Sequence, residues 1–227
     1  MAEKKFDITY LLDLSHTMAD KMLAHCDNPW SGLTQIRAYV KVLGDMLPKD
    51  EYNMVAPDVW VHRTARVAPS ASLTGPCIIG PFTEVRHCAF IRGNVLVGEN
   101  CVVGNSVELK TCILFDEVQV PHFNYVGDSI LGYKAHMGAG SITSNVRSDR
   151  KLVRVHRGDE VINTNLKKFG AILGDGVEIG CNAVLNPGTI IGKNCLIYPL
   201  ANVRGVVVRD SIFKANGEII PRNADSE

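Results

Sequence analysis

The sequence predicts a mainly β protein built as a parallel β-helix of six-residue repeats. From residue 55 to residue 109 an aliphatic side chain stands at every sixth position. A small side chain follows most of these four positions later, as at Ala65 and Ala71. The same spacing returns from residue 173 to residue 203. A fixed period of this kind indicates stacked coils, because one short coil cannot bury its apolar side alone.

Composition sets the class of protein. The chain has 227 residues, of which 46% are hydrophobic and 21% charged, as in an ordinary globular protein. Its 24 acidic and 24 basic residues cancel, which gives no reason to expect nucleic acid or a membrane as partner. The opening residues MAEKKFD lack an apolar signal region, so we expect a cytoplasmic protein. The seven cysteines form no closely spaced pair, and no metal site is expected.

Residues 1–50 are expected to form a helical cap. Apolar residues in 6–26 recur at helical spacing, and a second apolar stripe runs from Leu33 to Leu47. The Asn28-Pro29 pair opens the turn between them. The two helices are expected to pack as a hairpin on the first coil, because an uncovered β-helix end invites edge-to-edge association.

Residues 51–209 are expected to form the β-helix itself. Its six-residue steps shorten to five between Leu109 and Leu114, and again between Val126 and Leu131. Irregular steps in a regular repeat favour a functional site, here within residues 110–145.

The repeat stops at residues 146–169, where two short β-rich runs surround Arg157-Gly158-Asp159. This segment is predicted to be a β-hairpin arm that covers the site or embraces a neighbouring subunit. Residues 210–227 are polar and are expected to be a loose tail.

Three side chains suggest the chemistry. Arg92 and Lys110 are separated by one full coil of three repeats, so they should stack as a cationic ladder suited to a phosphate. His122 falls in the next coil. An imidazole there could accept a proton from an amine that attacks a thioester, because histidine titrates close to neutral pH.

The order of these residues resembles a known family. The motif Arg-x17-Lys-x11-His-x-x-Tyr-x-Gly-Asp begins at Arg92, and the block Gly-Ala-Gly-Ser-Ile-Thr-Ser-Asn ends at Asn145. Both are similar to the C-terminal acetyltransferase domain of the bifunctional N-acetylglucosamine-1-phosphate uridyltransferase/glucosamine-1-phosphate acetyltransferases. The arm and the run Leu-Lys-Lys-Phe-Gly-Ala at 166–171 look more like the archaeal sugar-1-phosphate nucleotidyltransferase/acetyltransferases. The resemblance covers about residues 55–209 and implies a left-handed coil and a homotrimer with shared sites.

The resemblance also implies a role for each matching residue. His122 would be the general base, acetyl-CoA the acyl donor, and an amino-sugar phosphate the acceptor. The implied acceptor contacts are Arg92, Lys110, Tyr125, His136, Asn145 and Lys151, and those of acetyl-CoA are Ala139, through its backbone, and Cys181. Two positions depart from the family. His136 replaces an asparagine, and Val146 replaces a tyrosine, which puts the identity of the acceptor in doubt.

The leading hypothesis is an acetyl-CoA-dependent N-acetyltransferase that acts on an amino-sugar 1-phosphate, similar to glucosamine 1-phosphate, or on a related nucleotide sugar. No pyrophosphorylase domain is expected, because no glycine-rich nucleotide loop is present. One alternative is a non-catalytic β-helix that binds a sugar nucleotide or assembles subunits. Another is a metal-dependent hydratase of the γ-carbonic-anhydrase type, although His122 and His136 are too widely spaced to replace the missing His-x4-His pair.

Overall fold

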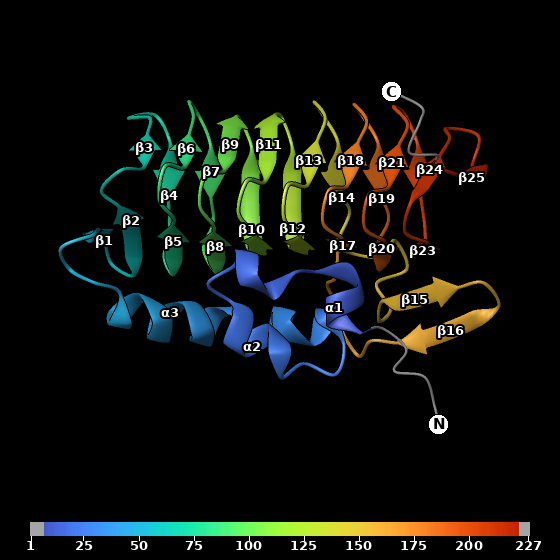
Figure 1. Ribbon diagram of the computed structural model, residues 1–227, viewed down its shortest axis with the longest axis horizontal. Coiled ribbons are helices and arrows are strands. Elements are labelled where there is room, and N and C mark those ends of the chain that lie inside the picture. Colours follow the sequence, from blue (N-terminus) through green and yellow to red (C-terminus); the bar gives the residue numbers. More distant parts are fainter. Residues whose placement is uncertain (1–6, 223–227) are drawn as a thin grey trace.

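The computed structural model describes residues 7–222 and shows a long prism of stacked coils with helices along one side (Figure 1). Each coil contributes one short strand to each of three faces, and strands of successive coils pair in parallel. The predicted fold class, a mainly β left-handed parallel β-helix of hexapeptide repeats, is confirmed.

We number the faces 1 to 3. Face 1 consists of β4 (Ser72–Leu73), β7 (Phe90–Ile91), the start of β10 (Glu108–Leu114), the start of β12 (Tyr125–Leu131), β14 (Ile142–Thr143), β19 (Val184–Leu185) and β22 (Asn202–Val203). Face 2 consists of β2 (Val59–His62), β5 (Cys77–Ile79), β8 (Val95–Val97), the ends of β10 and β12, β17 (Ala171–Leu173), β20 (Thr189–Ile191) and β23 (Val206–Val207). Face 3 consists of β3 (Arg66–Val67), β6 (Glu84–Val85), β9 (Val102–Asn105), β11 (Gln119–His122), β13 (His136–Met137), β18 (Glu178–Ile179), β21 (Leu196–Ile197) and β24 (Ser211–Phe213).

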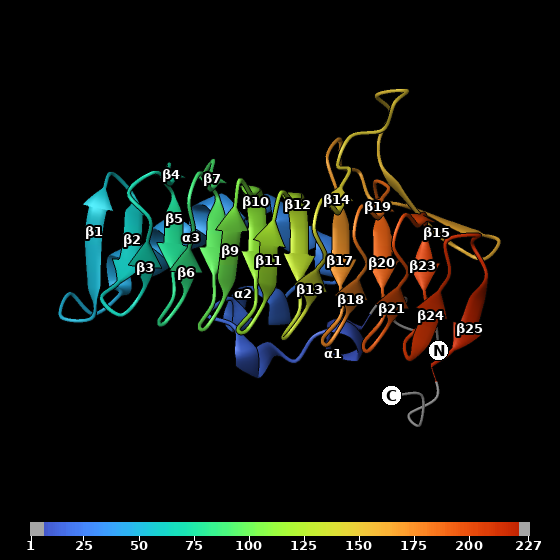
Figure 2. The ribbon, with the colours of Figure 1, turned by 90° about the horizontal axis from the view of Figure 1, so that it is seen from above.

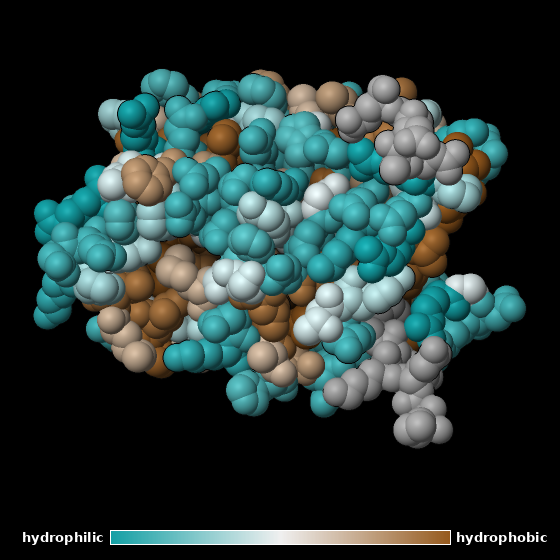
Figure 3. All heavy atoms as spheres, in the orientation of Figure 1, coloured by the Kyte–Doolittle hydropathy of each residue, from teal (hydrophilic) through white to brown (hydrophobic). Residues whose placement is uncertain are grey.

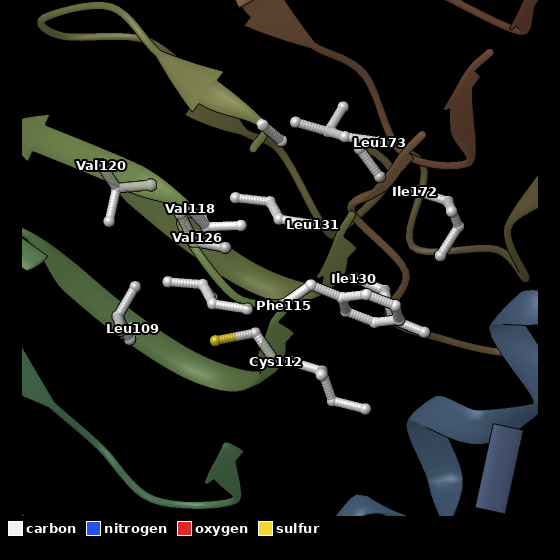
Figure 4. Packing of buried hydrophobic residues seen from close by; sticks show 14 of the residues in the cluster. Leu109, Cys112, Phe115, Val118, Val120, Val126, Ile130, Leu131, Ile172 and Leu173 are labelled. Carbon is white, nitrogen blue, oxygen red and sulfur yellow. The ribbon is translucent and has the colours of Figure 1, made fainter. Parts of the chain in front are cut away.

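The aliphatic residue of each repeat points into the prism, where it stacks on its equivalents in the neighbouring coils (Figure 4). Leu109, Val120 and Leu131 represent the three faces and are fully buried. Because most strands turn an apolar residue inward, the core is one continuous column along the axis.

The shortened repeats coincide with two unusually long strands. β10 and β12 run from face 1 through the corner to face 2, with a single residue of positive φ in each corner, Thr111 at 48° and Asp128 at 48°. Leu109 pairs with Ile91 of the preceding coil at the full coil spacing, whereas Lys110 pairs with Gly127 of the next coil at a spacing shorter by one position. The repeat that is shorter by one residue therefore makes this corner tighter, and the strand continues through the corner.

The repeat begins one step later than its spacing predicts. Val55 lies in β1 (Tyr52–Ala56), which pairs antiparallel with β2 at the edge of the sheet, and its side chain is 59% exposed. The first inward residue of the prism is Val61, which is buried.

The N-terminal helices do not cap the first coil, so that prediction is wrong. They are α1 (Ile8–Leu11), η1 (Leu14–His16), α2 (Asp20–Ala24), η2 (Pro29–Thr34) and α3 (Ile36–Met46), and they run along face 2 (Figure 1). α3 contacts β5, β8 and β10, and η2 contacts β12. The single amphipathic helix predicted for residues 6–26 is instead three short turns, and residue 6 lies outside the described residues.

Face 2 needs this cover because its strands are apolar on both sides. Its outward positions carry Ile78, Leu96, Ile113, Ile130 and Ile172, all of which are at most 1% exposed under the helices. Apolar side chains stay exposed around α3 (Figure 3). Val42 and Met46 of this helix are 60% and 75% exposed. None of the described helices is long and apolar enough to cross a membrane.

The arm leaves the prism after β14 and forms a hairpin of β15 (Arg154–Arg157) and β16 (Glu160–Asn163), as predicted. Figure 2 shows the arm projecting from the prism and β15 lying beside β23. Val153 and Val155 are fully buried and attach the arm to face 2.

The expected loose tail is ordered as far as the structure describes it. β24 continues face 3 beside β21, and β25 (Ile219–Pro221) folds back antiparallel on β24. Because Ile212 and Phe213 extend the hexapeptide pattern by one strand, the β-helix ends later than residue 209. Residues 223–227 lie outside the described residues.

Candidate functional site

The predicted site residues gather mainly at the two corners that bound face 1. One corner, here called the cation corner, joins face 1 to face 2 and holds Arg92, Lys110 and Asn145. The other, the histidine corner, joins face 3 to face 1 and holds His122 and residues of the two following coils. Only two residues separate His122 from Tyr125, so the Cα atoms at the two ends of this short segment are at most about 11 Å apart.

Arg92 and Lys110 occupy equivalent positions in successive coils, because the amide of Arg92 donates to the carbonyl of Leu109. Both side chains have a carboxylate partner that the sequence prediction did not include. Arg92 Nη1 lies 2.6 Å from Glu108 Oε1, and Lys110 Nζ lies 3.0 Å from Asp128 Oδ2. The predicted cationic ladder is therefore neutralised within the chain.

Asp128, Asn145 and Tyr125 form one hydrogen-bonded group with Lys110. Asn145 Nδ2 donates to Asp128 Oδ2 and also to the Tyr125 hydroxyl at 3.1 Å. Burial raises the pKa of Tyr125, and the carboxylates of Asp128 and Glu108 add to the rise. The phenol is therefore neutral at physiological pH and accepts the bond from Asn145.

Glycine is required beside this phenol. A Cβ on Gly127 would stand 2.5 Å from the Tyr125 hydroxyl and 2.9 Å from Asn145 Nδ2. The Tyr-x-Gly-Asp motif thus has a steric reason, because the glycine makes room for the tyrosine and the aspartate fixes Lys110 and Asn145.

His122 ends β11 at the histidine corner, and its side chain is exposed. Within residues 7–222 its imidazole makes no hydrogen bond or ion pair, whereas its backbone is held at both ends. Its amide donates to Asn124 Oδ1 at 3.1 Å, and its carbonyl accepts from the amide of Gly140 at 3.0 Å. The ring is thus open to solvent on a fixed turn.

Asn124 positions that turn and was missed by sequence reasoning. It is 2% exposed, and its Nδ2 donates to the carbonyl of Gly138 at 2.8 Å and to the carbonyl of Ser141 at 3.1 Å. Its signal in the sequence was a polar amide where the repeat otherwise places a small residue.

Ala139 and Cys181 follow His122 along the histidine corner. The amide of Asn182 donates to the carbonyl of Ala139 at 2.9 Å, and a Cβ on Gly138 would lie 2.7 Å from the amide nitrogen of Cys181. His122, Ala139 and Cys181 therefore belong to three successive coils of the same corner. The Cys181 side chain is exposed.

Two predicted residues lie apart from this group. His136 projects from face 3, where its Nδ1 lies 2.8 Å from Glu178 Oε2 of the next coil. Lys151 is exposed on the arm, and its amide donates to Asp149 Oδ1 at 3.1 Å. Neither touches Tyr125 or Asn145 within the described chain. In residues 7–222 no group of three or more His, Cys, Asp or Glu side chains is arranged to hold a metal ion.

Two family models match the chain. Residues 73–178 match the model described as GMPPB C-terminal domain. Residues 170–205 match the model described as bacterial transferase hexapeptide (six repeats). Together they include every predicted site residue.

Several relatives in sequence are named as bifunctional proteins. The chain is 39% identical over 132 residues to the bifunctional protein GlmU of Methanococcus aeolicus, covering 58% of this chain and 32% of the relative. It is 34% identical over 126 residues to a bifunctional sugar-1-phosphate nucleotidylyltransferase/acetyltransferase of Sulfurisphaera tokodaii, covering 56% of this chain and 31% of the relative. The chain thus matches about a third of the length of these relatives.

Among solved structures, the acetyltransferase domain of PglB from Neisseria gonorrhoeae, in complex with acetyl coenzyme A, superposes with a TM-score of 0.35 at 16% identity. The match covers 72% of this chain and 57% of that one. The comparisons confirm the resemblance that the motifs indicated: the chain is similar in sequence to the bifunctional sugar-1-phosphate nucleotidyltransferase/acetyltransferases and carries their hexapeptide repeats.

Proposed function

We propose that this protein is an acetyl-CoA-dependent N-acetyltransferase whose acceptor is an amino sugar bearing a phosphate. The observation that carries the proposal is the arrangement along face 1. The imidazole of His122 has no partner among residues 7–222, and it stands close in the chain to Tyr125. Tyr125 belongs to a hydrogen-bonded polar group with Asn145, Asp128 and Lys110. The relative from Sulfurisphaera tokodaii is named a bifunctional sugar-1-phosphate nucleotidylyltransferase/acetyltransferase, which supports this assignment.

The proposed reaction uses side chains of the cation corner and of the histidine corner. The sugar would bind at the cation corner, where Tyr125, Asn145, Lys110 and Arg92 offer hydrogen bonds to hydroxyl groups. Its amine attacks the carbonyl carbon of the acetyl thioester, so that a C–N bond forms and the C–S bond breaks. His122 accepts the proton of the amine, and coenzyme A leaves as the thiol after protonation.

The donor would lie along the histidine corner. There Ala139 supplies backbone groups, and Cys181 lies one coil further on. Acetyl-CoA placed on this corner brings its thioester beside His122, and the acceptor reaches it from across face 1. We propose that the protein works in the cytoplasm as a homotrimer, in which His136 and Lys151 serve the site of a neighbouring subunit.

The test is the substitution His122→Ala, with release of the coenzyme A thiol as the measurement. Removal of a positioned general base should lower kcat by about 100-fold or more. His87→Ala is the matched control, because His87 lies at the same kind of corner in an earlier coil and its Nδ1 is 2.9 Å from Ser70 Oγ. Unchanged turnover in a folded His122→Ala protein would remove His122 from the mechanism.

A further inference from the structure

A hollow of about 300 Å³ opens where the arm meets the prism. We call it the arm hollow. It is lined by Ser144, Val146, Arg147, Ser148, Asp149, Arg154, His156, Asn186, Pro187 and Arg204. Ser144 and Val146 flank Asn145, so the hollow continues the cation corner into the following coils. None of the residues assigned above to His122 chemistry lines it.

The local sequence explains why these side chains meet. At the start of β15 the buried Val153, just before the strand, and Val155 alternate with Arg154 and His156, which therefore project from the opposite side. Glycines of positive φ at the corner, Gly188 and Gly205, let the backbone of β15 approach. An ideal Cβ on Gly188 would lie 2.6 Å from the carbonyl oxygen of Arg154, and one on Gly205 would lie 2.6 Å from that of His156.

The arm hollow has an excess of positive charge. Its lining contains three arginines and one carboxylate, Asp149, which Arg147 already binds through two hydrogen bonds of 2.9 and 2.6 Å. Arg204 donates only to a neutral partner, Asn186 Oδ1 at 3.3 Å, and Arg154 has no carboxylate partner in the described part of the chain. By contrast, Arg92 and Lys110 are each paired with a carboxylate.

Two uncompensated guanidinium groups beside serine hydroxyls match a phosphorylated ligand, because guanidinium binds phosphate oxygens in fork geometry. We propose that the arm hollow binds a diphosphate group, and that this diphosphate belongs to a nucleotide-linked amino sugar. The inference rests on the proposed function, and it moves the acceptor's phosphates from Arg92 and Lys110 to the arm hollow.

The position favours the acceptor over coenzyme A, which also carries a diphosphate. Asn145 donates to the Tyr125 hydroxyl, and its two sequence neighbours line the hollow, so a sugar at Tyr125 would direct its anomeric phosphates toward the hollow. The donor residues Ala139 and Cys181 lie at the other corner of face 1.

The test is calorimetric titration of the full-length protein with inorganic pyrophosphate, with uridine diphosphate and with coenzyme A. We expect the double variant Arg154→Gln/Arg204→Gln to bind pyrophosphate and uridine diphosphate at least about tenfold more weakly than the unchanged protein. Its affinity for coenzyme A should be unchanged. Arg150→Gln is the control, because it removes the same charge from an exposed arm residue outside the hollow.

Equal pyrophosphate binding by the unchanged protein and the double variant, or no binding by either, would overturn the proposal. Selective loss of coenzyme A binding would instead assign the hollow to the donor and overturn the acceptor assignment. The outcome does not depend on acetyl transfer, because pyrophosphate binds without reaction. Hollow-dependent binding in a protein that never acetylates would contradict the proposed function alone. Circular dichroism of the double variant checks its fold, which depends on Val153 and Val155 and not on the exposed arginines.

Discussion

Asn124 shows how one buried amide can determine where an exposed side chain stands. It joins the turn after His122 to the next coil through the carbonyls of Gly138 and Ser141, and no buried side-chain nitrogen or oxygen of the described residues lacks a partner. The imidazole of His122 has no hydrogen bond or ion pair within that part of the chain, so this turn sets its position. We therefore assign Asn124 as a positioning residue.

Asn124→Ala should lower the free energy of unfolding by about 1–3 kcal/mol, because two carbonyls and an amide would lose their buried partner. It should also lower kcat more than it changes the acceptor KM, since the base moves and the sugar group at Tyr125 does not. Urea unfolding and steady-state kinetics measure the two effects.

Asn105→Ala is the matched control for this substitution. Asn105 lies one coil before His122 and pairs with it across the strands. Its Nδ2 donates one solvent-exposed hydrogen bond of 3.3 Å to the carbonyl of His87. Its replacement should stay within about 0.5 kcal/mol of the unchanged protein. Equal effects of the two substitutions on kcat would contradict the positioning role of Asn124.

At the scale of elements, α3 depends on close approach to the prism. A Cβ on Gly44 would stand 2.5 Å from atoms of the Trp60 ring, and that ring is only 6% exposed. Glycine inside a helix is unfavourable by about 1 kcal/mol relative to alanine, so its presence here has a packing reason.

Gly44→Ala should therefore destabilise the protein by about 1–3 kcal/mol, because overpacking against Trp60 exceeds the gain in helix propensity. Val42→Ala, at a side chain 60% exposed on the same helix, should change stability by at most about 0.5 kcal/mol. Thermal and urea unfolding compare the two. A stabilising Gly44→Ala would mean that α3 does not pack on Trp60.

The elements also show what the sequence could and could not predict. The inward residue recurs at every sixth position, so the coils were predictable from spacing alone. The outward residues Ile78, Leu96, Ile113 and Ile130 form a second apolar row, spaced by about one coil. This row explains why the helices lie along face 2 and do not cover the end of the prism. A period of one coil is harder to notice in a sequence, because the residues of the two other faces stand between successive outward residues of face 2.

The sequence predicts which site residues lie together only where their spacing in the repeat determines the face or corner on which they stand. Arg92 and Lys110 share a corner because they are one coil apart, and Tyr125 lies on face 1 beside Glu108, one coil after it. The carboxylate partners were not foreseen, because the stacking of equivalent positions does not show which carboxylate each cation meets. Asp128 follows Lys110 by 18 residues, whereas Glu108 follows Arg92 by 16. His136 lies apart from Tyr125 because His136 belongs to a strand of face 3 and Tyr125 to a strand of face 1.

At the scale of the whole molecule, face 1 stays open and carries an exposed Phe90 and the half-buried Ile142 beside the polar group at Tyr125. The helices and the base of the arm cover face 2, and the N-terminal segment also contacts the corner between faces 2 and 3. These surfaces leave room for other subunits on the two remaining faces, in agreement with the homotrimer proposed above.

A trimer predicts a mass in sedimentation equilibrium that is three times the 24.8 kDa of one chain. A mixture of inactive His122→Ala and His136→Ala chains, refolded together, should recover part of the activity if His136 serves a neighbouring site. A species of 24.8 kDa that is fully active would contradict both the assembly and the shared site.

The most direct test of the central claim is a thiol-release assay with acetyl-CoA and a panel of acceptors. The panel should hold amino-sugar 1-phosphates and the corresponding nucleotide-linked amino sugars. The proposed function predicts thiol release with at least one of them, and the arm hollow predicts that a nucleotide-linked sugar is the better acceptor. Absence of release across the panel, from a folded protein that binds acetyl-CoA, would contradict the N-acetyltransferase assignment.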